Sequence, residues 1–234
     1  MSEESDPPRL AEAFWRGVRA EVPLLIGVAP FGMIYGVLAL SAGIPPAAAQ
    51  AMSAMVFAGS AQFITTQLYA TATPLILTVL TIFVVNLRHL LYSASIAPYL
   101  QPLRPAWKFL LAYLLTDEAY AVTIAEYQRA PTYRNPSPGF FLGAGLALWA
   151  CWQASTAVGV FLGANLPQNW SLDFTLALTF IAIIVPTLKD RGLVAAALIA
   201  SLTALLSGGL PYKLGLLLAT LLGILGGYWL GDER

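Results

Sequence analysis

The chain has 234 residues, of which 58% are hydrophobic and 10% are charged, whereas an ordinary globular domain has roughly 25% charged residues. It carries 12 basic and 12 acidic residues, so no excess of positive charge points to nucleic acid as a partner. Between Glu21 and Arg88 there is no Asp, Glu, Lys or Arg. This composition excludes a soluble enzyme and predicts an all-α integral membrane protein embedded in the lipid bilayer.

The first 20 residues are acidic and then mildly basic, without the apolar segment and small-residue cleavage site of a signal peptide. We expect residues 1–20 to be a cytoplasmic leader, in part helical, and residues 21–234 to form one transmembrane helical domain. A crossing helix needs about 20 mostly apolar residues. On this basis prolines, glycines and charges delimit eight candidate spans, near residues 22–41, 47–70, 74–98, 108–128, 139–163, 171–188, 192–208 and 212–230.

The expected fold is a bundle of about eight (seven to eight) transmembrane helices, some of them broken near mid-membrane. With eight spans, most Arg and Lys residues lie on the side of the N-terminus, which the positive-inside rule assigns to the cytoplasm together with the C-terminus. Four glycine pairs spaced by four residues allow close helix packing and could also receive a partner helix: Gly32/Gly36, Gly139/Gly143, Gly159/Gly163 and Gly223/Gly227.

The first two spans each have a weak point near the middle. The first contains Pro30, Phe31 and Gly32, and proline removes a helix hydrogen bond, so a kink or break is expected there. The second contains Gly59 and Ser60 in a run of small residues. Broken helices expose backbone groups that bind the carboxylate and ammonium of small zwitterions. Two consecutive weak points indicate a substrate site, although proline kinks and small residues also serve plain helix packing.

The third and fourth spans contain ionisable residues, which are costly inside lipid and usually functional. Arg88 and His89 lie in the third span, which is expected to tilt or break, and Asp117 and Glu118 lie in the fourth. Because the two spans form a hairpin, Arg88 and the acids should lie at nearly the same depth, where Arg88 pairs with one carboxylate. The other acid could then couple proton movement to transport.

Two alternatives remain open for this charged group. Arg88 could act as a structural clamp between two helices, and His89 suits a hydrogen-bonded packing role as well as a proton relay. The sequence contains no phosphate-binding loop and no cysteine–histidine cluster, so neither cofactor nor metal is expected. An intramembrane serine protease using Ser60 and His89 lacks the nucleophile turn of such enzymes, and no catalytic residue is expected.

Four stretches resemble the AzlC family, whose members are large subunits of branched-chain amino acid exporters. The resemblance extends from about Phe14 to Trp229. The stretches occur in the family's order and spacing: GVAPFGMIYG at 27–36, FAGSAQF at 57–63, NLRHLLYS at 86–93 with Ala97-Pro98 after it, and TDEAY at 116–120.

The resemblance implies a bacterial inner-membrane secondary transporter that exports leucine, isoleucine or valine with a small AzlD-type membrane subunit. The candidate substrate-binding residues are Pro30, Phe31, Gly32, Gly59, Ser60, Gln62 and Asn86. The candidate ion-coupling residues are Arg88, His89, Asp117 and Glu118. Phe31, Phe57 or Phe63 would meet the apolar end of the substrate. A non-transporting structural or assembly subunit is the alternative function.

Overall fold

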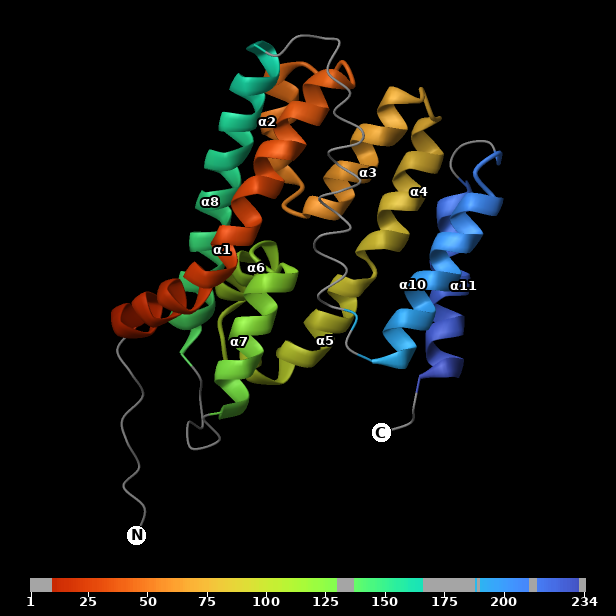
Figure 1. The fold of residues 1–234 in the computed structure, drawn as a ribbon. Helices are drawn as coiled ribbons and strands as arrows, with labels where there is room; N and C mark the ends of the chain where they lie inside the picture. The colour runs from red at the N-terminus through yellow and green to blue at the C-terminus, as the bar shows by residue number, and fades with distance from the viewer. Residues whose placement is uncertain (1–9, 130–136, 166–187, 189, 211–213, 232–234) are drawn as a thin grey trace. The chain divides into compact units, whose positions relative to one another are not determined.

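The computed structural model describes residues 10–129, 137–165, 188, 190–210 and 214–231, and every regular element within these ranges is an α-helix (Figure 1). The sixth predicted span lies almost wholly outside them. The helices, in chain order, are α1 (Leu10–Ser41), α2 (Pro46–Met55), α3 (Gly59–Ala70), α4 (Leu75–Asn86), α5 (Arg88–Leu100), α6 (Pro105–Tyr113), α7 (Asp117–Arg129), α8 (Pro138–Asn165), α10 (Arg191–Leu206) and α11 (Leu214–Leu230).

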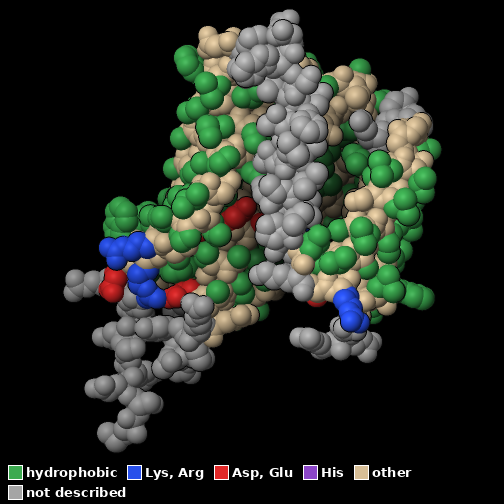
Figure 2. Space-filling view, viewed as in Figure 1, with side chains coloured by type: hydrophobic (Ala, Val, Ile, Leu, Met, Phe, Trp, Pro, Cys, Tyr) green, Lys and Arg blue, Asp and Glu red, His purple; other side chains and the backbone are tan. Residues whose placement is uncertain are grey.

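The described helices have the length and composition of membrane helices. Helices α1 and α8, and the stretch Leu75–Leu100 that comprises α4 and α5, are long and apolar enough to cross a membrane. Helices α10 and α11 are shorter but also apolar. Figure 2 shows hydrophobic side chains spread over the visible described surface, and most of the visible charged side chains lie where α1 begins. The predicted all-α membrane class is confirmed, while the number of spans stays a prediction.

The chain divides into two compact units, residues 1–66 with 82–166 and residues 67–81 with 167–234. All the candidate functional residues belong to the first unit. In the second unit α10 and α11 pack antiparallel, with Gly223 against Ala196 and Ala200 of α10, and Gly227 against Gly192 and Ala196. The predicted packing role of the Gly223/Gly227 pair is therefore confirmed.

The first unit is built on α1 and α8, which lie side by side and run in the same direction (Figure 1). The backbone of α8 at Gly143 contacts Phe14, and Gly159 contacts Met33 farther along both helices. A Cβ atom on Gly36 would lie 2.6 Å from the backbone oxygen of Thr156. Glycine at these positions lets the two backbones touch, as the small-residue spacing predicted.

Helix α1 differs from its prediction in two ways. It begins at Leu10 and not at residue 22, because the leader continues the same helix and packs through Gly17 against Phe140 of α8. It also continues unbroken through Pro23 and Pro30, so a break at Pro30 is wrong. Contacts with α8 along its length hold the helix despite the lost hydrogen bonds. Figure 1 shows that its N-terminal part lies at an angle to the rest.

Three later segments are each interrupted by a short non-helical step. Helix α2 stops at Met55 and α3 starts at Gly59, which confirms the predicted break in the second span. A single residue, Leu87, separates α4 from α5, as expected for the third span. The third interruption, at residues 114–116 between α6 and α7, was not predicted.

Polar side chains hold the first half-helix of the interrupted pair α2 and α3 against α8. Gln50 donates from Nε2 to Oε1 of Gln153 at 2.9 Å, and Ser53 shares a 2.9 Å hydrogen bond with Thr156. Tyr35 of α1 donates to the backbone oxygen of Ala49 at 2.9 Å. These bonds fix α2 in the first unit and so fix the position of the interruption that follows it.

Candidate functional site

Arg88 connects the three interrupted segments at one point. Its Nη1 donates to Oδ2 of Asp117 at 2.5 Å, and its Nη2 donates to Oγ of Ser60 at 2.7 Å. The predicted pairing of Arg88 with an acid of its hairpin neighbour is confirmed, and the partner is Asp117. We call Ser60, Arg88 and Asp117 the arginine cluster.

Each member of the arginine cluster stands at the beginning of a half-helix. Ser60 is the second residue of α3, Arg88 is the first of α5 and Asp117 is the first of α7. A helix N-terminus carries partial positive charge, which favours Asp117 and disfavours Arg88 at such positions. The ion pair compensates for this unfavourable placement of Arg88. The cluster therefore joins the N-terminal ends of three half-helices through their side chains.

The local sequence explains why α7 starts where it does. Thr116 Oγ1 accepts a hydrogen bond from the backbone nitrogen of Ala119 at 3.3 Å, which is the usual N-cap interaction. Asp117 and Glu118 follow in the first turn, where acidic residues stabilise the helix. Glu118 lies beside the ion pair and interacts with Thr116, Asp117 and Arg88. The chain thus places two neighbouring carboxyl groups at one interruption.

Three buried polar atoms at this site have no hydrogen-bond partner among the described residues. They are Oδ1 of Asn86, Nε of Arg88 and Oδ1 of Asp117. Buried polar groups in proteins are almost always hydrogen-bonded, so each unpaired one calls for an explanation. Here the Asn86 acceptor and the Arg88 donor lie two residues apart in the chain, on either side of Leu87. A molecule that carries both an ammonium and a carboxylate could satisfy both atoms.

Aromatic residues and His89 adjoin the cluster. Tyr92 interacts with Asp117 and stacks on Tyr120 with ring centroids 4.6 Å apart. His89 donates from Nδ1 to the backbone oxygen of Asn86 at 3.2 Å and packs edge-on against Tyr92. These contacts fit the packing role that was one of the two interpretations of His89.

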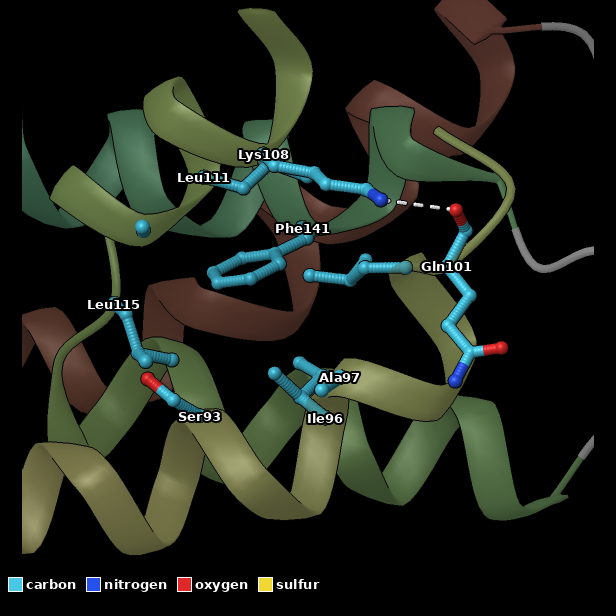
Figure 3. Close-up of a pocket in the computed structure, with 10 residues that line it drawn as sticks. Ser93, Ile96, Ala97, Gln101, Lys108, Leu111, Leu115 and Phe141 are labelled. Atoms are coloured by element: carbon cyan, nitrogen blue, oxygen red, sulfur yellow. Dashed lines mark hydrogen bonds between the residues drawn. The ribbon is translucent and has the colours of Figure 1, made fainter. Parts of the chain in front are cut away.

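An apolar cavity of about 240 Å³ lies between α5, α6 and α8 (Figure 3). Leu115 and Ser93 mark one end of it, and Gln101 and Lys108 mark the other, where Lys108 Nζ donates to the backbone oxygen of Gln101 at 3.0 Å. Ser93 comes five residues after Arg88, about 7.5 Å along α5 at the helical rise, and Leu115 comes two residues before Asp117. The residues at the Ser93 end of the cavity are therefore close in sequence to Arg88 and Asp117 of the arginine cluster.

The other predicted substrate residues take up packing positions. A Cβ on Gly32 would meet Ser155, and a Cβ on Gly59 would lie 2.9 Å from the Trp152 ring. Gln62 is fully buried and accepts a 3.0 Å hydrogen bond from Nε1 of Trp152.

The predicted aromatic residues and Pro30 lie elsewhere in the first unit. Phe31 and Phe63 pack edge to face with ring centroids 5.8 Å apart, and Phe57 packs against Tyr113. Pro30 is exposed on α1. Of the predicted substrate residues in the first two motifs, Ser60 accepts a hydrogen bond from Arg88.

Sequence reasoning missed two features of the site. Glu21 is fully buried in α1, whereas the prediction places it at the border of the leader. The helical pattern that starts at Leu10 is the signal that could have placed Glu21 inside the first helix. The start of α7 was also missed, although a threonine followed by two acids is a recognised helix-start signal.

Arg16 of α1 pairs with Glu126 of α7, which brings the beginning of α1 to the end of α7.

Comparison with known proteins gives consistent results. The family model described as "AzlC protein" matches residues 23–166. The chain is 27% identical to "Inner membrane protein YgaZ" of Escherichia coli, over 97% of this chain and 98% of that protein. It is 31% identical to an "Uncharacterized membrane protein" of Archaeoglobus fulgidus, over 76% of this chain and 77% of that protein.

A third relative, an "Uncharacterized membrane protein" of Helicobacter pylori, is 25% identical over 72% of each chain. No solved structure matches the chain significantly. The family match covers more than half of the chain and contains all the members of the arginine cluster. The protein is a membrane protein and belongs to the AzlC family.

Proposed function

We propose that the protein is a secondary active transporter that exports branched-chain or similar small hydrophobic amino acids, coupled to protons. It would act as the large subunit of a two-component permease with a small AzlD-like membrane subunit, in a bacterial cytoplasmic membrane and with both termini in the cytoplasm. The observation that carries the proposal is the arginine cluster, with the unpaired Asn86 oxygen and Arg88 Nε beside it.

The two ends of an aliphatic amino acid fit the two parts of the site. Its carboxylate would accept from Nε of Arg88, and its ammonium would donate to Oδ1 of Asn86 or to Asp117. Its side chain would enter the apolar cavity from the Ser93 end, where Ile96, Leu111 and Phe141 supply aliphatic and aromatic surface. This pose uses the helix interruption as substrate sites in broken-helix transporters do.

Flux measurements with a matched pair of variants test this proposal. Purified protein, with and without the small subunit isolated from the same membranes, is reconstituted into liposomes loaded with labelled leucine. Efflux is followed with an imposed pH gradient. Arg88→Lys keeps the charge but loses the planar fork and Nε, and we expect it to lower leucine flux at least tenfold. Arg104→Lys, at an exposed position before α6, is the control and should transport like the parent.

The result can contradict the proposal in two ways. Equal efflux from the Arg88→Lys and parent proteins would remove Arg88 from the substrate site. If the complex forms but no tested amino acid moves, the chain is a structural or assembly subunit, which was the alternative function.

A further inference from the structure

A buried acid outside the arginine cluster has no explanation in the site described so far. Glu21 of α1 has 0% of its surface exposed, and neither of its carboxyl oxygens has a hydrogen-bond partner among the described residues. It lies in a helix long and apolar enough to cross a membrane. An ionised carboxylate in such a place is strongly disfavoured unless it is paired, so a structural clamp would need a cation partner.

The charged group that acts on Glu21 has the same sign. Glu118 of α7 lies close enough to interact with Glu21 electrostatically, and Glu118 is itself partly buried. Two carboxyl groups that share a site do not both ionise readily, and their titrations become coupled. Ionisation of one of these two carboxyl groups therefore disfavours ionisation of the other.

Among the side chains that the structure describes on α1 and the helices packed against it, none is a cation that forms an ion pair with Glu21 or Glu118, although Arg88 acts on Glu118 electrostatically. Helix α8 contains no Asp, Glu, Lys, Arg or His, and its titratable group is Cys151. Helix α2 contains no titratable residue. Arg16 of α1 is paired with Glu126 of α7, and Arg88 at the start of α5 is paired with Asp117 of α7. The remaining titratable or charged groups on α1 and α7 whose side chains the structure describes are Glu12, Arg19, Tyr35, Tyr120 and Tyr127.

Arg19 is the cation nearest to Glu21 in sequence, and the helix directs it elsewhere. Residues two apart in an α-helix do not share a face, since they are separated by roughly 200° around the axis. Arg19 is accordingly exposed, whereas Glu21 is buried. The proximity of the two residues in sequence therefore does not supply Glu21 with a partner.

The position of the pair connects the charged helix ends with the arginine cluster. Glu21 is five residues, about 7.5 Å at the helical rise, along α1 from Arg16. Glu118 is adjacent to Asp117 and interacts with both Asp117 and Arg88. A proton gained or lost by the pair would therefore change the electrostatic field at Arg88.

We propose that Glu21 and Glu118 together form a proton-binding site, a buried carboxyl pair across α1 and α7 that carries the coupling proton. The proton binding stands by itself, whereas the coupling role rests on the proposed transport function. The two parts are tested by separate measurements on the full-length protein in lipid.

Infrared spectroscopy tests proton binding without any transport. A protonated carboxyl group absorbs in a region separate from carboxylates and amides, so a buried protonated pair gives a distinct band at neutral pH. We expect Glu21→Gln to abolish this band and Glu21→Asp to keep a shifted one. Glu12→Gln, at an exposed position of the same helix, is the matched control and should leave it unchanged. A parent protein without the band, or a band of full intensity in Glu21→Gln, would overturn the proton site.

Flux in the same liposomes tests the coupling role. Glu21→Gln is expected to exchange labelled for unlabelled leucine at the parent rate, while the acceleration of efflux by a pH gradient is lost. Full acceleration in Glu21→Gln would refute coupling through this pair. If the parent protein moves no amino acid, the proposed function fails, and the infrared result still decides whether the pair binds a proton.

Discussion

Replacing Gly36 with alanine tests the packing that holds the first unit together. A Cβ at this position would lie 2.6 Å from Thr156 O, 2.6 Å from Val160 N and 2.7 Å from Gly159 C. All three are backbone atoms and cannot rotate away. Gly27, nine residues earlier in the same helix, is exposed, and a Cβ there would have no neighbouring atom within 4 Å. The pair Gly36→Ala and Gly27→Ala therefore isolates the effect of packing.

The expected magnitude follows from the contact distances. Carbon atoms in contact prefer a separation of about 3.5–4.0 Å, so α1 and α8 must part locally by about 1 Å, and a gap of this size forfeits roughly a quarter to a half of the attraction at each contact. Overpacking of this kind costs about 1–3 kcal/mol. For a chain of this length 1 kcal/mol corresponds to about 2–4 °C in Tm. We expect Gly36→Ala to unfold about 2–12 °C below Gly27→Ala.

Cys151 provides the assay, because it is the chain's single cysteine and its Sγ lies 3.9 Å from the Leu25 oxygen of α1. A thiol-reactive dye that labels Cys151 on heating reports the separation of α1 from α8. The variants are compared in one detergent at one scan rate, since apparent midpoints of irreversible unfolding depend on the rate. Equal labelling midpoints for Gly36→Ala and Gly27→Ala would refute close contact between these backbones.

Four further single variants test the site. Arg88→Ala and Asp117→Ala should each destabilise the protein, and a double-mutant cycle measured by the same thermal assay should give a coupling energy of about 0.5–3 kcal/mol; a value of zero would contradict the ion pair. Trp152→Phe leaves the buried Gln62 oxygen without its donor, which should cost about 1–3 kcal/mol in unfolding free energy. Ala97→Phe partly fills the apolar cavity, so leucine flux should fall at least tenfold with an unchanged unfolding midpoint.

The arginine cluster was partly predictable because a hairpin fixes depth. Arg88 and Asp117 lie at nearly equal distances in sequence from the turn between their spans, and antiparallel helices must bring such residues together. The breaks near Gly59 and Arg88 were predictable for a related reason, since small or polar residues in mid-span weaken the helix. What the sequence did not specify was which of the two neighbouring acids binds Arg88, because that depends on where α7 starts.

The incorrect and missing predictions concern effects of tertiary contacts. Pro30 removes one hydrogen bond from α1, but the glycine-mediated contact with α8 keeps the helix continuous, and this contact joins residues more than 100 positions apart. The burial of Glu21 depends on the same contact and on α7, so its local sequence, which resembles the edge of a polar leader, could not indicate it. The unpaired Asn86 oxygen likewise becomes visible only when all of its described neighbours are known.

The direction of the helices favours a location of the arginine cluster within the bilayer. Helices α1 and α8 are parallel, so if both cross the membrane, the chain between them must cross an odd number of times. The pairing of Arg16 with Glu126 puts the start of α1 and the end of α7 on the same side of the membrane. The chain from the start of α1 to the end of α7 must therefore cross the membrane an even number of times, with the crossing of α1 included. One crossing by each of the three interrupted segments satisfies both conditions. Their interruptions, where Ser60, Arg88 and Asp117 meet, would then lie inside the membrane, where an unpaired charge is least tolerated.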